Sequence, residues 1–400
     1  MTMPGLPEIK YYLAVAENTV QKEDRIWSTP IPMRREHSPA NGGSVLSHGD
    51  YFLGVLKFLK KNRFKILAAA LSQHQGRDVT YEEIDEIRIF LEKHGEFYHP
   101  ARIEADLQGL TVLFVVNVAV SHVGKSRIQK EYRFLQKLNI DFPFDFLPKV
   151  YGLDRVFIKD DTLEIRLFLG EWFEGFCEFH VSCDPLDKTL KIVVWDPQHG
   201  NRSLTIDQSG ALYRQMAMIL TSYYNVETFE QISLWHHAAG DFVIRCQNDK
   251  IDVKLITVRQ YGPMFAGDAS KEIETHGQNP LKILEALLVF FLNLAIRMRL
   301  DRLDGVGEIV WSDRVAVRQT LQGVLDALAL KPPVGRFKKP LADAFREHLR
   351  SCTRTELSDL NQALVDTYHP RSPDVPVIKN HLKQHIDDLY CAIHWSGKFL

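Results

Sequence analysis

The sequence of 400 residues has only five cysteines, and they are scattered along it. No two of them form a Cys-x-x-Cys pair, the spacing typical of zinc ligands and redox pairs. Their odd number also argues against a framework of disulfide bonds. We therefore expect a cytoplasmic protein without a metal site, and a chain of this length can bury a sizeable core without cross-links.

The sequence has no long hydrophobic run either. Its most apolar segment, residues 287–296, is bounded by charged residues. This segment is shorter than the roughly 20 residues that a bilayer-spanning helix needs. The first residues lack the basic region and apolar stretch of a secretory signal. We expect residues 287–296 to form a buried helix, and we expect no membrane partner.

An excess of positive charge is also missing, because the net charge at pH 7 is −2. Nucleic-acid binding needs a concentrated positive field, so we expect no nucleic-acid partner. One local basic cluster, residues 57–65, coincides with an amphipathic helical pattern, and we interpret its lysines as the solvated face of that helix. The P-loop motif and the Gly-x-Ser-x-Gly elbow are absent, which argues against P-loop nucleotidases and α/β-hydrolases.

The order of periodic segments predicts an α+β fold. Thr80, with Glu83 three residues later, forms a capping-box pattern that predicts the start of a helix. The predicted strands are 11–15, 102–107, 111–121, 149–152, 155–159, 163–169, 176–182 and 189–195. The predicted helices are 50–73, one from Thr80 towards Gly95, 124–138, 211–224 and about four more from residue 280 onward.

These segments predict three parts of the chain. Residues 1–96 are expected to form an arm and a helical extension, residues 97–175 a sheet-rich small lobe, and residues 176–400 a mainly helical large lobe.

One stretch carries most of the functional information. Residues 235–245 read Trp-His-His-Ala-Ala-Gly-Asp-Phe-Val-Ile-Arg, and residues 250–257 read Lys-Ile-Asp-Val-Lys-Leu-Ile-Thr. A histidine and an aspartate on a tight loop, followed by a short hairpin, resemble the catalytic core of protein kinases and aminoglycoside kinases. The order of hairpin, helix, strands and a hinge-like segment at 170–175 resembles the same family. The resemblance implies a two-lobed kinase-like fold.

The resemblance also implies roles for particular residues. Asp241 is the candidate catalytic aspartate, which would orient or deprotonate an acceptor hydroxyl. His237 is the candidate loop histidine. Glu131 stands where the family has a helix glutamate, and Glu171 lies in the hinge-like segment. The implied cofactors are ATP and magnesium.

Several positions depart from the family pattern. Asn117 occupies the place of the strand lysine that holds the phosphates, and Thr257 occupies the place of the second aspartate, which holds magnesium. Both stay candidates for cofactor binding, but neither carries a charge. Cys246 replaces the metal-binding asparagine. The leading interpretation is therefore a degenerate or strongly divergent phosphotransferase that binds nucleotide without normal magnesium-dependent catalysis, with no assigned metal ligand.

The alternative is a non-catalytic regulatory module that docks a protein through its N-terminal helices or the cleft of the kinase-like scaffold. Three details concern the candidate site. Adjacent His236 and His237 would point to opposite sides of an extended backbone, so at most one can face a site. Arg259 could hold an anionic ligand, although pairing with an acid is the favoured interpretation. Asp241 has the corresponding alternative of a turn residue that binds nearby backbone amides.

Overall fold

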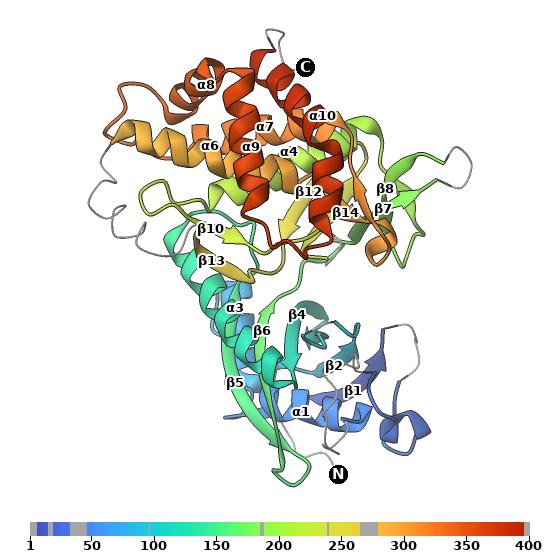
Figure 1. The fold of residues 1–400 in the computed structure, drawn as a ribbon. Coiled ribbons are helices and arrows are strands. Elements are labelled where there is room, and N and C mark those ends of the chain that lie inside the picture. Colours follow the sequence, from blue (N-terminus) through green and yellow to red (C-terminus); the bar gives the residue numbers. More distant parts are fainter. Residues whose placement is uncertain are drawn as a thin grey trace. The chain divides into compact units, whose positions relative to one another are not determined.

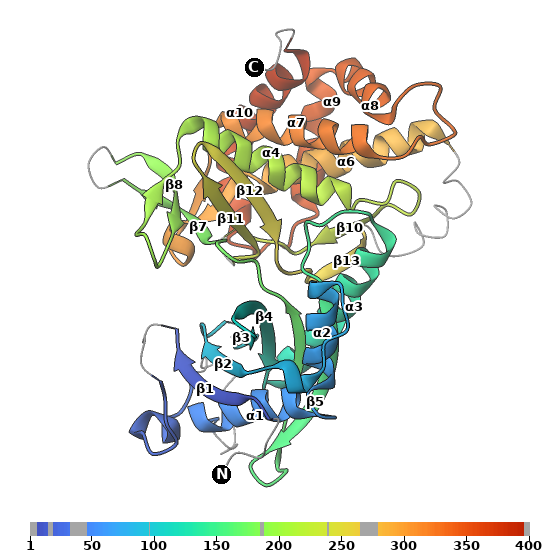
Figure 2. The ribbon, with the colours of Figure 1, turned by 180° about the vertical axis from the view of Figure 1, so that it is seen from behind.

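The computed structural model describes residues 6–14, 19–32, 46–95, 97–184, 188–237, 240–264 and 279–395. The chain divides into two compact units. Unit 1 comprises residues 1–140 and 148–174, and unit 2 comprises residues 141–147 and 175–400. Helices and strands occur in both units (Figures 1 and 2), and the prediction of an α+β fold is confirmed.

The described strands of unit 1 form one six-stranded sheet in the order β1-β2-β3-β4-β6-β5. β1 is parallel to β2, and the other neighbours are antiparallel. The elements of unit 1 are β1 (Glu8–Leu13), η1 (Arg25–Ser28), α1 (His48–Lys60), α2 (Lys65–Gln75), η3 (Tyr81–Glu83), β2 (Glu86–Leu91), β3 (Ala101–Leu107), β4 (Leu110–Ala119), α3 (His122–Asp141), β5 (Val150–Ile158) and β6 (Leu163–Glu171).

The sheet of unit 1 has an apolar face and a more polar face because its strands alternate. Ile89 and Ile103 belong to a buried cluster that also contains Phe52 of α1 and Leu67 of α2, so both helices pack on that face. On the other face, the ring of Phe168 in β6 packs against Tyr132 of α3, which places α3 there. The N-terminal strands and helices thus share one core with β3–β6.

The prediction that a helix extends from Thr80 towards Gly95 is wrong. Thr80 and Glu83 do form a capping box, but it begins only the short 3₁₀ helix η3. The chain continues as β2, in which Ile87, Ile89 and Leu91 are buried and the residues between them are half-buried. This segment pairs with β1 on one side and with β3 on the other. The spacing of apolar residues within the segment cannot reveal such partners.

The helix predicted at 50–73 is two helices. Asn62, Arg63 and Phe64 have φ angles of 51°, 55° and 58°, and a right-handed helix cannot continue through such angles. The strands predicted at 149–152 and 155–159 are a single strand, β5, with an irregular register near Val150. The predicted hairpin at 102–121 is confirmed as β3 and β4.

Unit 2 contains a helical assembly and four small sheets among its described residues, in the orders β7-β8-β9, β10-β13, β11-β12 and β14-β15. Its elements are β7 (Glu178–Cys183), β8 (Leu190–Trp195), β9 (Arg202–Ser203), α4 (Ile206–Ser222), β10 (Glu230–Ser233), β11 (Phe242–Gln247), β12 (Lys250–Leu255), β13 (Gln260–Pro263), α6 (Pro280–Arg297), β14 (Leu300–Arg302), η4 (Leu303–Gly305), β15 (Ile309–Trp311), α7 (Arg314–Leu330), α8 (Leu341–Ser351), α9 (Arg354–Asp366) and α10 (Asp374–His394).

The helices of unit 2 bury the most apolar segment of the sequence, as predicted. Residues 287–296 lie in α6, and Leu287, Phe291 and Ile296 are fully buried there. Among the described residues, no helix combines the length and hydrophobicity that crossing a membrane requires.

Candidate functional site

The segment 234–241, which we name the aspartate loop, connects β10 to β11 in unit 2. Leu234 and Gly240 have φ angles of 60° and 65°. The amide of Gly240, the residue before Asp241, donates to the carbonyl of His237 over 2.9 Å. A Cβ atom at position 240 would lie 2.8 Å from Oε1 of Glu178, so both the backbone angle and the space favour glycine.

The carboxylate of Asp241 is completely buried, with an exposed fraction of 0%. Its Oδ2 accepts a hydrogen bond from the backbone N–H of His236 at 2.8 Å. Its Oδ1 accepts from the hydroxyl of Thr257 at 3.2 Å and from Nη2 of Arg259 at 2.6 Å. Both carboxylate oxygens are therefore occupied by groups of the protein itself, and these three donors favour the ionised, acceptor-only form of the side chain.

Burial raises the pKa of Asp241, while the charge of Arg259 and the three hydrogen bonds oppose this rise. The backbone of Asp241 is fixed as well, because its carbonyl accepts the amide of Ile256 at 2.8 Å. That bond ties the start of β11 to the residue before Thr257. The favoured interpretation of Arg259, an arginine paired with an acid, is confirmed.

The two adjacent histidines lie in different environments, as their alternation predicts. His237 has an exposed fraction of 3%, and its ring stacks on Trp235 with a centroid distance of 5.5 Å. His236, by contrast, is exposed. Only His236 can therefore meet a ligand from solvent, and His237 packs inside the unit.

His237 makes the stability of the fold sensitive to acid. Burial, followed by the charges of His236, Arg297 and His180, lowers its pKa to about 3. An unfolded histidine binds a proton near pH 6.5, so stability is unaffected above that pH and falls as the pH drops towards 3. Replacing His237 with phenylalanine should remove about 2 kcal/mol of the stability loss between pH 7 and pH 5.

Urea unfolding of both proteins at the two pH values measures this difference. An equal loss of stability in the wild type and His237→Phe would show that His237 is not the group that resists protonation.

Arginines gather around the exposed side of the aspartate loop. Loss of hydration, followed by the charges of Arg297, Arg259 and Arg302, lowers the pKa of His236 to about 4. Nη2 of Arg297 donates to the carbonyl of Trp235 at 2.5 Å, and its guanidinium lies 5.1 Å from the centre of the Trp235 ring. Three guanidinium groups thus lie near His236, and the charge of one of them, that of Arg259, is balanced by Asp241.

The structure brings together some of the predicted site residues. Asp241 and Thr257, chosen as the positions of the two family aspartates, are hydrogen-bonded to each other in unit 2. Asn117, Glu131 and Glu171 lie in unit 1. Asn117 is half-buried on β4, and Glu131 is buried on α3.

Glu171 has a structural contact at the end of β6. Its Oε2 accepts the amide of Lys149 at 3.1 Å, and its backbone amide donates to the carbonyl of the same lysine at 2.9 Å. These bonds hold β5 and β6 together where the strands end.

The described residues contain no group of three or more histidine, cysteine, aspartate or glutamate side chains that could hold a metal ion. The acids near the aspartate loop serve other contacts. Asp252 pairs with Arg245 at 3.2 Å across the hairpin of β11 and β12. Asn248 has a φ of 55° and forms the turn of that hairpin. Thr257, which the kinase resemblance places at the position of a magnesium-binding aspartate, is neutral.

Sequence reasoning missed Arg297 and Arg302. They follow the aspartate loop by about sixty residues, at the end of α6 and in β14. No local motif marks them, and only the folding of α6 against the loop brings their charges near His236. The one available signal was that Arg297 ends the most apolar helix of the chain.

No protein-family model matches this sequence. No curated protein matches it at a significant level either.

Proposed function

We propose that this chain is a degenerate phosphotransferase of the kinase-like type, which binds a nucleotide through its phosphates without magnesium and does not transfer phosphate. The observation that carries the proposal is the state of Asp241. A catalytic aspartate must reach the acceptor hydroxyl of a substrate. Here the carboxylate is buried, and its oxygens already accept three hydrogen bonds, one of them from Arg259.

In this proposal, Arg259 also supplies the positive charge that a magnesium ion supplies in an active phosphotransferase. Phosphoryl transfer depends on magnesium to neutralise charge on the phosphates, and acidic ligands hold that ion. At this loop the neighbouring position is Thr257, and the counter-charge to Asp241 is a guanidinium at 2.6 Å. The guanidinium of Arg259 can neutralise charge, but it cannot bridge phosphate oxygens and acidic ligands as a metal ion does. The loop therefore lacks the metal site that phosphoryl transfer needs.

The arginines around His236 support the anion-binding part of the proposal. Arginine recognises phosphate through its planar set of N–H donors. Arg302 is exposed, and among the described residues its guanidinium donates only to the carbonyl of Gly307, at 3.1 Å, so other N–H groups face a ligand. ATP is the probe to use, because the kinase resemblance implies a nucleotide.

The test is a calorimetric titration of ATP, in EDTA, into the wild type and into Arg302→Gln. The proposal predicts that the variant binds ATP at least tenfold more weakly, because it loses one phosphate contact. Arg314→Gln is the matched control, since Arg314 is also an exposed arginine of unit 2 and begins α7. An equal loss in both variants would mean that only overall charge matters, and no loss in either would remove the aspartate loop as the binding site.

The alternative function, a regulatory module that docks a protein, is favoured by a separate observation. An open groove with exposed apolar side chains lies on unit 1, beside the N-terminal helix α1.

A further inference from the structure

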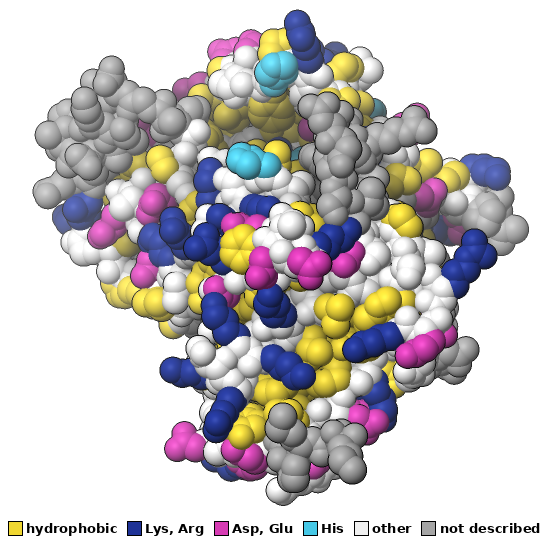
Figure 3. All heavy atoms as spheres, turned by 90° about the horizontal axis from the view of Figure 1, so that it is seen from below, with side chains coloured by type: hydrophobic (Ala, Val, Ile, Leu, Met, Phe, Trp, Pro, Cys, Tyr) yellow, Lys and Arg dark blue, Asp and Glu magenta, His cyan; other side chains and the backbone are white. Residues whose placement is uncertain are grey.

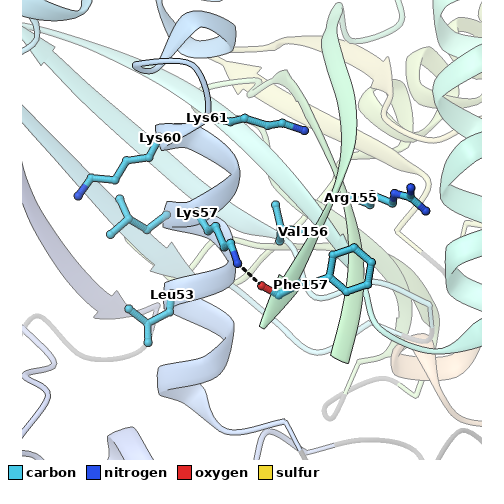
Figure 4. A pocket seen from close by; sticks show the side chains of 8 residues that line it. Leu53, Lys57, Lys60, Lys61, Arg155, Val156 and Phe157 are labelled. Atoms are coloured by element: carbon cyan, nitrogen blue, oxygen red, sulfur yellow. Dashed lines mark hydrogen bonds between the residues drawn. The ribbon is translucent and has the colours of Figure 1, made fainter. Parts of the chain in front are cut away.

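The groove of unit 1 lies between α1 and the strand β5. It has a volume of about 630 Å³, and its walls are drawn in Figure 4. The lining residues are Leu53, Leu56, Lys57 and Lys60 of α1, Lys61 directly after this helix, and Arg155, Val156 and Phe157 of β5. Figure 3 shows a face of the molecule on which hydrophobic side chains gather in a patch that Lys and Arg side chains border.

The lining of the groove combines an apolar floor with positive charge. Leu53 and Phe157 keep exposed fractions of 41% and 37%, although both are large hydrophobic side chains. Four of the lining residues are lysine or arginine, and none is an acid. An exposed apolar patch with a charged rim is typical of an interaction site, and this rim calls for an acidic partner.

Two of the four cations are unpaired or only loosely paired among the described residues, and these two can meet such a partner. Lys57 is held by Asp161 at 3.1 Å, and Lys61 pairs with Asp154. Within the described part of the chain, Lys60 makes no ion pair. Arg155 is only loosely paired, with 3.8 Å to a carboxylate oxygen of Glu164 and a side chain that is 63% exposed. Lys60 belongs to α1 and Arg155 to β5, so each wall of the groove offers one positive charge.

The edge of the sheet indicates how the partner docks. β5 is the last strand in the sheet order, and a free edge can pair with an added strand. The ammonium group of Lys57, however, donates to the carbonyl of Phe157 at 2.6 Å. This contact blocks one acceptor of the edge and opposes strand addition. A helix that inserts its side chains into the groove needs no backbone pairing.

We propose that this groove docks an acidic amphipathic helix of a partner protein. Its apolar side chains fill the floor beside Leu53 and Phe157, and its carboxylates meet Lys60 and Arg155. The α1 wall runs from Leu53 to Lys61, which is about 12 Å at the rise of an α-helix and matches about two turns of a bound helix. A membrane surface fits less well, because a flat bilayer does not reach an apolar floor that lies in a hollow.

The experiment uses two synthetic helical peptides of about 14 residues, or four turns. One carries leucine or phenylalanine on one face and glutamate elsewhere, and its counterpart has lysine for every glutamate. Fluorescence anisotropy measures their binding to the full chain. We expect the acidic peptide to bind the wild type, and the double variant Leu53→Glu/Lys60→Glu to bind it at least tenfold more weakly. The basic peptide should not bind the wild type.

The matched control is the double variant Leu110→Glu/Lys130→Glu. Both of its positions are exposed residues of unit 1 outside the groove, and the change in net charge is the same. This control should keep the affinity of the wild type. Circular dichroism of both variants establishes that they fold.

Three results overturn the proposal. They are no binding of the acidic peptide at millimolar concentration, equal binding to both double variants, and equal binding of the acidic and basic peptides. Laurate and vesicles of anionic phospholipid are titrated in parallel. Binding of either that is lost in Leu53→Glu/Lys60→Glu, without peptide binding, would assign the groove to lipid instead. This docking groove is separate from the proposed nucleotide site, so Arg302→Gln should leave the affinity for the acidic peptide unchanged.

Discussion

Replacing Asp241 with alanine will lower the free energy of unfolding by about 3–5 kcal/mol, the usual cost of breaking a buried ion pair from one side. The change leaves the guanidinium of Arg259, the amide of His236 and the hydroxyl of Thr257 without their common acceptor. Denaturant unfolding of the full chain, followed by its intrinsic tryptophan fluorescence, to which Trp235 contributes, measures the effect. Trp235 suits this purpose because it is buried beside the aspartate loop.

The matched control is Asp252→Ala on the neighbouring hairpin. Asp252 also pairs with an arginine, but both side chains are more than a third exposed. Such surface pairs contribute about 0–1 kcal/mol, so the control should change stability little. A catalytic aspartate behaves in the opposite way, because its removal abolishes turnover while stability stays the same or rises. Unchanged stability in Asp241→Ala would therefore contradict the structural role that we assign to this residue.

A loss of the same size, about 3–5 kcal/mol, is expected for Asp388→Ala. Asp388 on α10 accepts a hydrogen bond from Arg299 at 2.8 Å, and the two side chains are only 10% and 4% exposed. Arg299 also donates to the carbonyl of Ser312 at 2.8 Å and lies over the ring of Trp311 at 4.8 Å. Without Asp388, the buried positive charge of Arg299 loses the carboxylate that accepts its hydrogen bond.

The preceding residue of the same helix gives the control for this prediction. Asp387 pairs with Arg354, and that pair is 40% and 52% exposed. Asp387→Ala should cost at most about 1 kcal/mol. Thermal unfolding of both variants, monitored by circular dichroism, compares them directly. Equal shifts of Tm would mean that burial does not increase the contribution of the Arg299–Asp388 pair to stability.

The fold could be predicted from the sequence where a segment fitted only the spacing of a strand or only the spacing of a helix. Strict alternation identified β3, and the Gln108-Gly109 turn identified the hairpin to β4, since both residues take positive φ there. The segment that became β2 satisfied helical and strand spacing at once, and a true capping box at Thr80 favoured the wrong choice. Only pairing with strands distant in sequence decides such a case.

The candidate site was predictable to the extent that its residues are close in sequence. The turn before Asp241 and the hairpin to Thr257 follow from local chemistry, and their proximity is what the kinase resemblance implies. The burial of Asp241 and the cluster of Arg297 and Arg302 depend on how α6 and β14 fold against the loop. No spacing rule encodes that arrangement, so the pairing of Asp241 with Arg259 became visible only in three dimensions.

The most direct test of the central proposal is calorimetric titration of the wild type with ATP, once with magnesium and once with EDTA. If an arginine has replaced the metal at the aspartate loop, the Kd for ATP will be the same in both buffers. Binding that requires magnesium and disappears in Asp241→Asn would contradict the proposal. It would show that the carboxylate leaves Arg259 to hold a metal ion, as in an active phosphotransferase.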